Sequence, residues 1–260
     1  MGARSKTVRK VGAVDKALAI LFVLAQNSQD WGVSELARAL HESPSVVHSL
    51  LRTLYERGVV DQNPATRKYY LGLGAVEIGQ AALKRLAVLE QGREPLRALA
   101  HTVGECAYLM VRAQRSVVLI DRADPPVGAH VAMQVGMTSP LHAGATSKAL
   151  MAFLPPEEIA AYLQEGPLEA AGPRTVTDPD TLLRDLAQIR ADGFAYTEEE
   201  VHDGLAAVAA PIFNHTGRVV AGVGVAGLIE RVRGRKYEIA QAVRATARSI
   251  SQYLGAPRSG

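Results

Sequence analysis

Cysteine and long apolar runs are both scarce in this sequence of 260 residues. The one cysteine, Cys106, has no partner for an internal disulfide, which favours a reducing compartment such as the cytoplasm. No stretch approaches the roughly eighteen consecutive apolar residues that a membrane helix needs. The basic segment 1–10 is not followed by the apolar core of an export signal. We therefore expect a soluble, cytoplasmic protein with no membrane partner.

The composition is otherwise that of a folded protein, with 48% hydrophobic and 21% charged residues. The length fits two domains with a core each. The net charge of +3 is unevenly distributed. Residues 1–75 contain ten Lys and Arg against six Asp and Glu, whereas residues 76–260 contain nineteen against twenty. A small basic domain joined to a larger neutral one fits a protein that binds nucleic acid at one end, although an excess of +4 also fits a surface charged only for solubility.

Helical periodicity dominates the basic part. Apolar residues recur at helical spacing over 14–25 and again over 33–40. Ser43 and Pro44 then form a helix start, because serine caps the first turn and proline lacks an N–H that would be unbonded there in any case. The sequence therefore predicts three helices, the third ending near Arg57.

The outward face of the third helix carries the candidate DNA contacts. They lie at helical spacings of three and four or at the helix start, and they are Ser45, Val46, His48, Ser49 and Arg52. An ordinary solvated face is the alternative interpretation. A merely solvated face has no need to follow a tight helix-turn-helix and to precede a cationic wing, and the second helix of a helix-turn-helix is the one that enters the major groove, which favours the DNA interpretation. We expect His48 and Arg52 to contact phosphates or base edges and Val46 to contact a thymine methyl group.

Two short strands are predicted after the third helix, over 59–61 and 69–71. The turn between them carries Arg67 and Lys68, which we expect to lie along the DNA backbone or in the minor groove. The order of three helices followed by a β-hairpin indicates a winged helix-turn-helix domain over residues 1–72.

Residues 73–90 are predicted to form one linker helix. Its apolar surface over 76–89 is larger than one face of a lone helix requires, so we expect it to pack against a second chain. Residues 91–260 then predict an α+β domain with a mostly antiparallel sheet. Its expected helices cover 91–103, a stretch that begins at Gly144 and ends before Pro155, 156–164, 179–191 and 235–254. Its expected strands cover 106–113, 116–123, 129–135, 194–198, 206–213 and 219–226.

Several short segments resemble the IclR family of bacterial transcription regulators. They are 14–21, 140–150 (PLHAGATSKAL), 193–196, 208–212 and 217–221, in the order and spacing of that family. The resemblance spans about residues 11–255. It implies a winged helix-turn-helix, a linker helix and an effector-binding domain of GAF-like or profilin-like fold, assembled as a homodimer or a dimer of dimers. It also implies a regulator of double-stranded operator DNA, with a repressor of a catabolic operon favoured over an activator.

The sequence departs from the family's common pattern at both expected sites. Where many members have lysine, threonine and arginine around the start of the recognition helix, this chain has Pro44, Val46 and Ser49. Base readout is therefore expected to differ. Where several members place cysteine and two serines in the effector pocket, this chain has Ala207, Gly224 and Ala226, which predicts a roomier and less polar pocket.

The expected effector is a small organic acid with an apolar body, for which an aromatic ring is a candidate. Its carboxylate is expected at the backbone N–H groups of Gly144 and Ala145, because a helix start offers free donors and a favourable dipole. The expected walls of the pocket are Tyr108, Leu141, Leu205, Ala207, Gly224 and Ala226.

An enzyme with a basic helical N-terminal unit is the alternative function. The sequence shows no nucleophile and base pair, phosphate loop or dinucleotide fingerprint, so no catalytic residue and no cofactor is expected. His142 and the pair His202 and Asp203 lack further ligands at metal-binding spacing, so no metal site is expected. The acidic run 198–200 is expected to be solvated, with one member able to help close the effector pocket. The sequence leaves open the effector's identity, the operator and the choice between dimer and tetramer.

Overall fold

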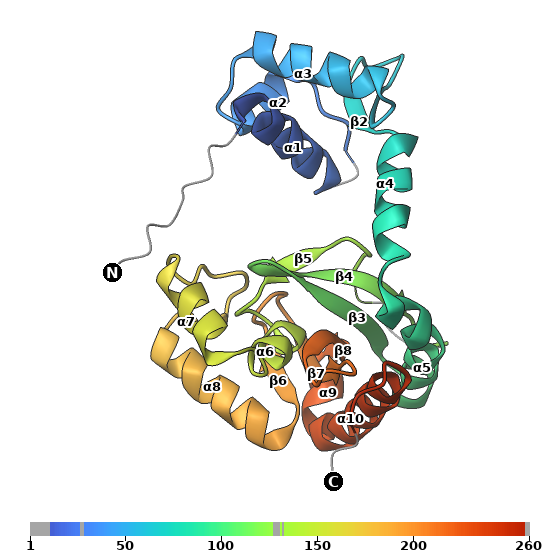
Figure 1. The fold of residues 1–260 in the computed structure, drawn as a ribbon, viewed down its shortest axis with the longest axis vertical. Coiled ribbons are helices and arrows are strands. Elements are labelled where there is room, and N and C mark those ends of the chain that lie inside the picture. The colour runs from blue at the N-terminus through green and yellow to red at the C-terminus, as the bar shows by residue number, and fades with distance from the viewer. Residues whose placement is uncertain (1–10, 27–28, 127–130, 132, 258–260) are drawn as a thin grey trace. The chain divides into compact units, whose positions relative to one another are not determined.

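The structure, a computed structural model, describes residues 11–26, 29–126, 131 and 133–257 (Figure 1). The chain forms two compact units, the first ending at Arg85 and the second beginning at Leu86. Within the described residues, every helix is too short or too polar to cross a membrane.

The first unit is a three-helix domain with a β-wing, as the sequence predicts. Its elements are α1 (Gly12–Ala25), α2 (Val33–Ala39), α3 (Pro44–Glu56), β1 (Val60–Gln62), β2 (Tyr69–Leu71) and α4 (Leu73–Leu83). Strands β1 and β2 pair antiparallel, and Trp31 adds a bridge to Tyr69. The core collects the buried apolar residues of the helices and the wing: Ile20, Leu24, Leu36, Ala37, Val47, Leu51, Val60 and Tyr69.

The expected single linker helix over 73–90 is instead two helices. Helix α4 ends at Leu83, and α5 (Ala87–Val103) begins a new helix that belongs to the second unit. The side chains at 84–86 are all compatible with a helix, so local propensity does not explain the break. Val88 and Leu89 are buried in the second unit, whereas α4 buries none of its residues. Packing in the second unit therefore fixes where α5 starts.

The second unit is an α+β domain around one sheet, which confirms the predicted class. Its strands are β3 (Cys106–Ala113), β4 (Ser116–Ala123), β5 (Thr138–Pro140), β6 (Ala195–Glu198), β7 (Leu205–Phe213) and β8 (Val219–Leu228). Its other helices are α6 (Ala145–Met151), α7 (Pro156–Gln164), α8 (Pro179–Asp192), α9 (Ile229–Val232), a 3₁₀ turn (Arg233–Arg235) and α10 (Lys236–Tyr253). The six strands pair antiparallel in the order β5-β4-β3-β8-β7-β6.

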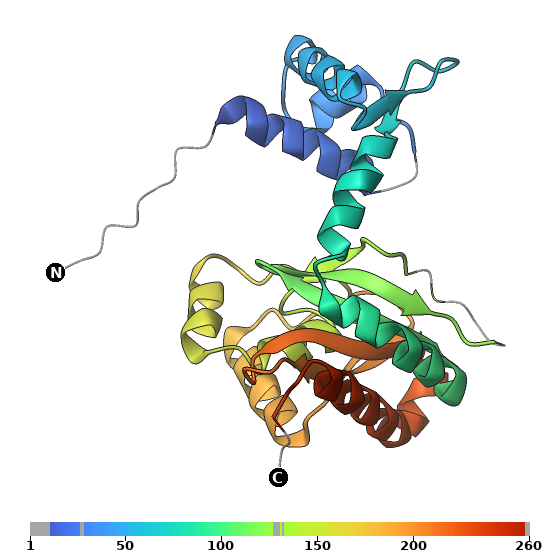
Figure 2. The same cartoon turned by 45° about the vertical axis from the view of Figure 1, so that its right-hand side comes forward.

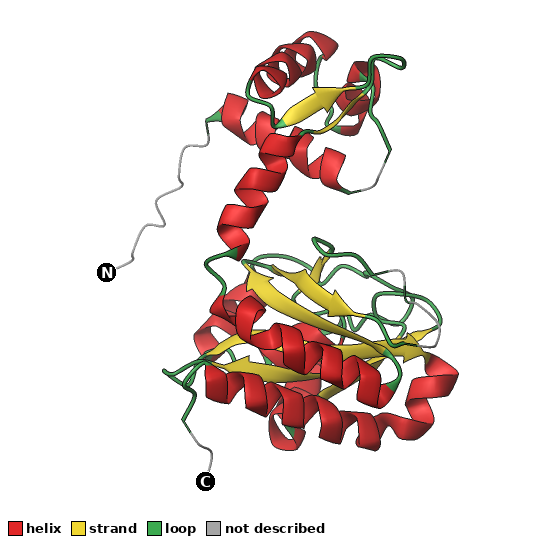
Figure 3. Cartoon of the chain, turned by 90° about the vertical axis from the view of Figure 1, so that its right-hand side faces the viewer, coloured by secondary structure: helices red, strands yellow, loops and turns green. Residues whose placement is uncertain are grey.

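Helices cover both faces of this sheet. Helices α5 and α10 lie side by side on one face (Figures 2 and 3), where Gly92 of α5 packs on Leu109 of β3. Helix α6 packs on the other face against β7 and β8, and α8 packs on α6 in turn. Because successive strand residues point to opposite faces, Tyr108, Met110, Ala207 and Ala226 share the α6 side.

The strand expected over 129–135 is the one strand prediction that the structure does not bear out. Residues 129, 130 and 132 lie outside the described residues, and Val131 and 133–135 are not in a strand. The short edge strand β5 lies a few residues later and pairs with β4, with Val117 opposite Ser139.

Candidate functional site

Helix α3 presents a polar, exposed surface that agrees with the predicted recognition face. Ser43 caps the helix, since its hydroxyl accepts from the N–H of Val46 at 3.4 Å, and Pro44 occupies the first turn. Val47 and Leu51 are buried and hold the opposite face against the core. The five predicted contact residues are all exposed: Ser45, Val46, His48, Ser49 and Arg52.

The basic side chains near this face differ in how strongly neighbouring carboxylates neutralise them. Arg52 pairs with Glu56 one turn later at 3.1 Å, but both side chains are well exposed, so the pair is weak and a phosphate can displace it. Lys68 Nζ lies 2.9 and 3.1 Å from the two carboxylate oxygens of Glu35. Lys68 is therefore a partly neutralised cation.

Arg67, the other wing cation, is exposed and has a backbone φ of 60°, in the left-handed region. Glu35 also accepts from the N–H of Gly32 at 2.7 Å, and its two partners hold the pKa of this carboxyl below its usual range. The wing thus offers Arg67 to a phosphate more readily than Lys68.

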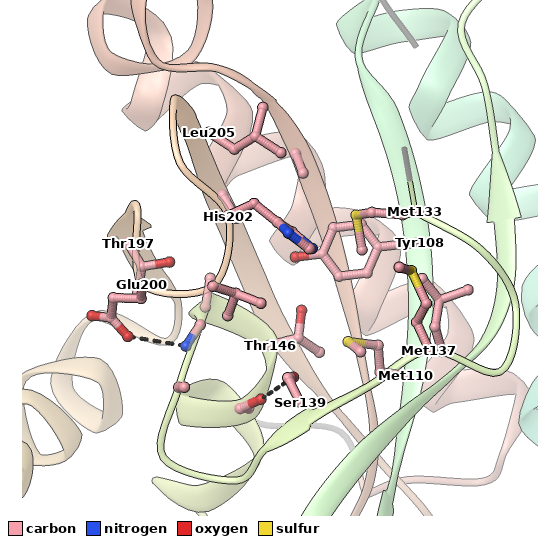
Figure 4. A pocket seen from close by; sticks show the side chains of 18 of the residues that line it. Tyr108, Met110, Met133, Met137, Ser139, Thr146, Thr197, Glu200, His202 and Leu205 are labelled. Carbon is pink, nitrogen blue, oxygen red and sulfur yellow. Dashed lines mark hydrogen bonds between the residues drawn. The ribbon is translucent and has the colours of Figure 1, made fainter. Parts of the chain in front are cut away.

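A pocket lies on the α6 face of the second sheet (Figure 4). It is bounded by β3, β7 and β8, the start of α6, the residues before β5 and the turn between β6 and β7. Its volume is about 80 Å³. Six of the eight predicted effector residues line it: Tyr108, Gly144, Ala145, Leu205, Ala207 and Ala226.

The two remaining predictions, Leu141 and Gly224, do not line the pocket. Leu141 is fully buried in the core of the domain. Gly224 faces the correct side of the sheet, but the Tyr108 ring lies directly over it, and a Cβ there would lie 2.6 Å from the ring. The Tyr108 ring thus fills the space that a side chain at position 224 would occupy. At Gly224 the absence of a side chain therefore leaves no open room, whereas Ala207 and Ala226 do line the pocket.

The pocket is also more polar than the sequence predicted. Ser139 and Ser147 place their hydroxyls 3.2 Å apart. Thr146 is buried, and its Oγ1 makes no hydrogen bond of good geometry among the described residues. Burial raises the pKa of the neighbouring Tyr108 hydroxyl to about 12, an effect that the Thr146 hydroxyl beside it partly offsets. Buried polar atoms are rarely left without a partner, so Thr146 marks a place where a ligand can bind.

The N–H of Gly144, predicted to receive the effector's carboxylate, already has a partner in the protein. Glu200 Oε2 accepts from it at 3.0 Å (Figure 4), and Glu200 Oε1 lies 2.6 Å from Lys148 Nζ. Lys148 is buried and also pairs with Asp185 of α8 at 2.8 Å. The prediction for Gly144 is therefore corrected. The free donors at this helix start lie beyond it, because the first bond within the helix runs from Lys148 N to Gly144 O.

The acidic run divides between two roles. Glu198 pairs with Arg233 at 2.8 and 2.9 Å, which together with the Tyr196 hydroxyl lowers the pKa of Glu198 to about 2. Glu199 and Glu200 line the pocket instead. Glu200 is buried, and its contacts with Lys148, 52 residues away in the sequence, and with the N–H of Gly144 explain why a carboxylate is stable there.

Sequence reasoning missed several lining residues. They are Met110, Leu119, Met133, Met137, Thr138, Ser139, Ala143, Thr146, Ser147, Thr197, Val201, His202 and Ala206, whereas Glu199 and Glu200 belong to the acidic run from which one member is expected to help close the pocket. The two-residue period of β3 places Met110 beside Tyr108 and gives a signal for it. Met133 lies in the segment 129–135, whose apparent strand period the structure does not bear out, and Met137 lies beyond it, so the sequence pattern gives no correct signal for either residue.

His142, considered above as a metal ligand, and the Cys106 thiol both have structural roles. His142 is buried, with its ring nitrogens 2.7 Å from the Tyr162 hydroxyl and 2.9 Å from the carbonyl of Glu169. Burial raises the pKa of the Cys106 thiol to about 11, which makes it a core residue rather than a nucleophile. Among the residues that the structure describes, no three His, Cys, Asp or Glu side chains gather as metal ligands would.

Comparison with known proteins identifies the same family in both units. Residues 13–64 match the IclR helix-turn-helix domain, and residues 80–252 match the family described as bacterial transcriptional regulator IclR C-terminal. The regulator BhcR of Paracoccus denitrificans is 35% identical over 93% of this chain and 86% of its own length. The glycerol operon regulatory protein of Streptomyces coelicolor is 32% identical over 96% and 99%. An IclR transcriptional regulator from Alicyclobacillus acidocaldarius has the same fold, with a TM-score of 0.83, 27% identity and coverage of 95% and 100%.

Proposed function

The chain belongs to the IclR family of bacterial transcription regulators, and on that premise we propose how its two sites work together. It binds DNA through the first unit and an effector through the second. We propose that the bound form is a dimer on a two-fold operator, that the effector is a small organic acid, and that the acid lowers operator affinity, as in a repressor.

A dimer is needed for specificity. One recognition helix reads only a few base pairs, so two copies spaced about 34 Å apart, or a multiple of that distance, are required for a defined operator. The exposed face of α3 supplies the contacts, with Arg52 and Arg67 as the cations best placed for phosphates.

The first unit also exposes the apolar surface that a dimer would cover. Val14, Leu18 and Phe22 form a stripe along α1 and are 56%, 49% and 70% exposed. On α4, Val76 and Ile78 are 56% and 62% exposed. Apolar surface of this extent on two helices of one small domain supports a protein interface. We propose that α1 and α4 form the dimer contact. Leu86, which the sequence placed in the linker helix, lies beyond α4 and is left out.

The buried hydroxyl of Thr146, which lies beside the Tyr108 hydroxyl but makes no hydrogen bond of good geometry among the described residues, is the single observation that carries the proposed effector site. A carboxylate there would accept from Thr146 Oγ1 and from the N–H groups of Ala145 to Ser147, which the helix leaves unused. Lys148, which Glu200 and Asp185 share, offsets part of the charge of Glu200 and so reduces its repulsion of a bound carboxylate. A ligand-soaked crystal structure, or perturbation of the Thr146 resonances by NMR, tests this site.

Thr146→Val should separate effector binding from folding. Valine keeps the shape and removes only the hydroxyl, so we expect effector affinity to fall roughly 10-fold to 100-fold, the value of one hydrogen bond to a charged group. The stability should change by no more than about 1 kcal/mol, because the hydroxyl that is removed makes no hydrogen bond of good geometry among the described residues and lies beside the Tyr108 hydroxyl. Calorimetric titration and thermal unfolding measure the two effects. Unchanged effector affinity would move the carboxylate away from Thr146.

Arg52→Ala should weaken operator binding. If the guanidinium contacts a phosphate, affinity should fall to a similar degree on specific and unrelated duplexes, and the slope of log K against log salt should shrink by about one. Arg97→Ala, in the second unit, is the matched control, since that arginine is also exposed and also pairs within its own helix. An unchanged slope together with unchanged affinity would remove Arg52 from the contact surface.

A further inference from the structure

The size of the pocket limits what it can hold as it stands. An engineered apolar cavity of about 150 Å³ in another protein holds benzene. The pocket of about 80 Å³ is roughly half of that, enough for a small acid but not for an aromatic ring. An aromatic acid can enter only if part of the wall moves.

Most of the wall is rigid. The strand side consists of short side chains whose backbone belongs to the centre of the sheet, such as Ala207 and Ala226. Tyr108 is held over Gly224 by close contact. On the side of α6, Glu200 and Lys148 tie the helix start to the β6–β7 turn. None of these groups can retreat without breaking hydrogen bonds or core packing.

The opposite side of the pocket is made of methionine (Figure 4). Three of the five methionines of the chain, Met110, Met133 and Met137, gather there. Methionine is unbranched and has three rotatable side-chain bonds, so it adapts its shape to what it packs against. Met110 and Met133 are buried, whereas Met137 is 41% exposed and has solvent to move into.

The backbone that carries Met137 is fixed although its side chain is not. Leu119 N donates to Met137 O at 2.9 Å, and Gly136 N donates to Leu119 O at 2.8 Å, which ties this turn to β4. The side chain has one polar contact, its sulfur accepting from Gln134 N at 3.0 Å, and thioether sulfur is a weak acceptor. Met137 can therefore rotate outward without unfolding the turn.

We propose that Met137 is the residue that sets the upper size of the effector. With its side chain inward, the pocket holds a short acid anchored at Thr146. With its side chain outward, the same anchor serves an acid with a ring. This inference rests on the proposed acid effector. It adds that Met137 determines which sizes of acid the pocket accepts.

The test compares pyruvate, as a short acid, with benzoate, as an aromatic one, by calorimetric titration of the full chain. In Met137→Ala, the ratio of benzoate affinity to pyruvate affinity should rise at least tenfold over that of the wild type, because the widened wall no longer has to move. Val135→Ala is the matched control, since Val135 lies in the same segment, is exposed and does not line the pocket. Its ratio should equal that of the wild type.

The outcomes are distinct. If pyruvate binds and the ratio is unchanged in Met137→Ala, or if Val135→Ala shifts it equally, Met137 does not set the size and the inference is overturned while the acid effector stands. If neither acid binds any of the three proteins, the proposed acid effector is wrong and the inference falls with it. Thermal unfolding checks that Met137→Ala is folded.

Discussion

The double substitution Val76→Lys and Ile78→Lys should give a monomeric protein whose operator affinity is lower by about two orders of magnitude or more. Both side chains are exposed in the single chain, and α4 buries none of its residues, so the first unit should still fold. In the proposed dimer the same positions are covered, and an unpaired charge at a buried contact costs several kcal/mol. A monomer loses the second half-site, and joining two binding modules is worth a factor of 10² to 10⁴.

Sedimentation and operator titration measure the two consequences. The matched control adds two lysines at exposed polar positions of the second unit, Gln164→Lys with Gln188→Lys, and should remain a dimer with wild-type operator affinity. A Val76 and Ile78 double variant that sediments as a dimer would place the interface elsewhere in the chain.

Ala207→Leu should abolish effector binding, with an effector affinity at least 100-fold lower than that of the wild type, while operator affinity stays unchanged. Ala207 lies on β7 and lines the pocket, and three added carbon atoms would fill much of a volume of about 80 Å³. A side chain that enters an existing cavity avoids most of the 1–3 kcal/mol that overpacking a filled core costs. The operator should therefore stay bound at effector concentrations that release the wild type.

Ala160→Leu is the control for this change, because Ala160 is exposed on α7 and does not line the pocket. Gly224→Leu, which the strand periodicity alone would suggest, is a poor test. Leucine there would collide with Tyr108 and Thr146, so a loss of effector response would report a damaged core. If Ala207→Leu protein still releases DNA at the wild-type effector concentration, the effector binds somewhere other than this pocket.

The elements that sequence predicted well are those set by local chemistry. Helix α3 starts where Ser43 and Pro44 place it, because capping and a missing N–H act within one turn. Strands β3 and β4 have the predicted bounds, since alternation on either side of the turn at Gln114 and Arg115 leaves little choice of register.

The errors occur where distant residues decide. The break between α4 and α5 depends on the burial of Val88 and Leu89 in the second unit, and the residues at 84–86 give no sign of it. Glu200 belongs to an acidic run that is typical of a solvated turn, and its burial depends on Lys148. Gly224 was placed on the correct face, but its pairing opposite Tyr108 decides what covers it.

The most direct test of the coupling between the two units is operator affinity with and without a bound acid. Fluorescence anisotropy of a labelled operator gives the Kd of the full-length wild type alone and with a saturating concentration of an acid that calorimetry has shown to bind. The proposed repressor should show a Kd at least tenfold higher with the acid, and Thr146→Val should show the same shift only at proportionally higher acid concentrations. An operator Kd that stays the same with every acid that binds the pocket would contradict the account.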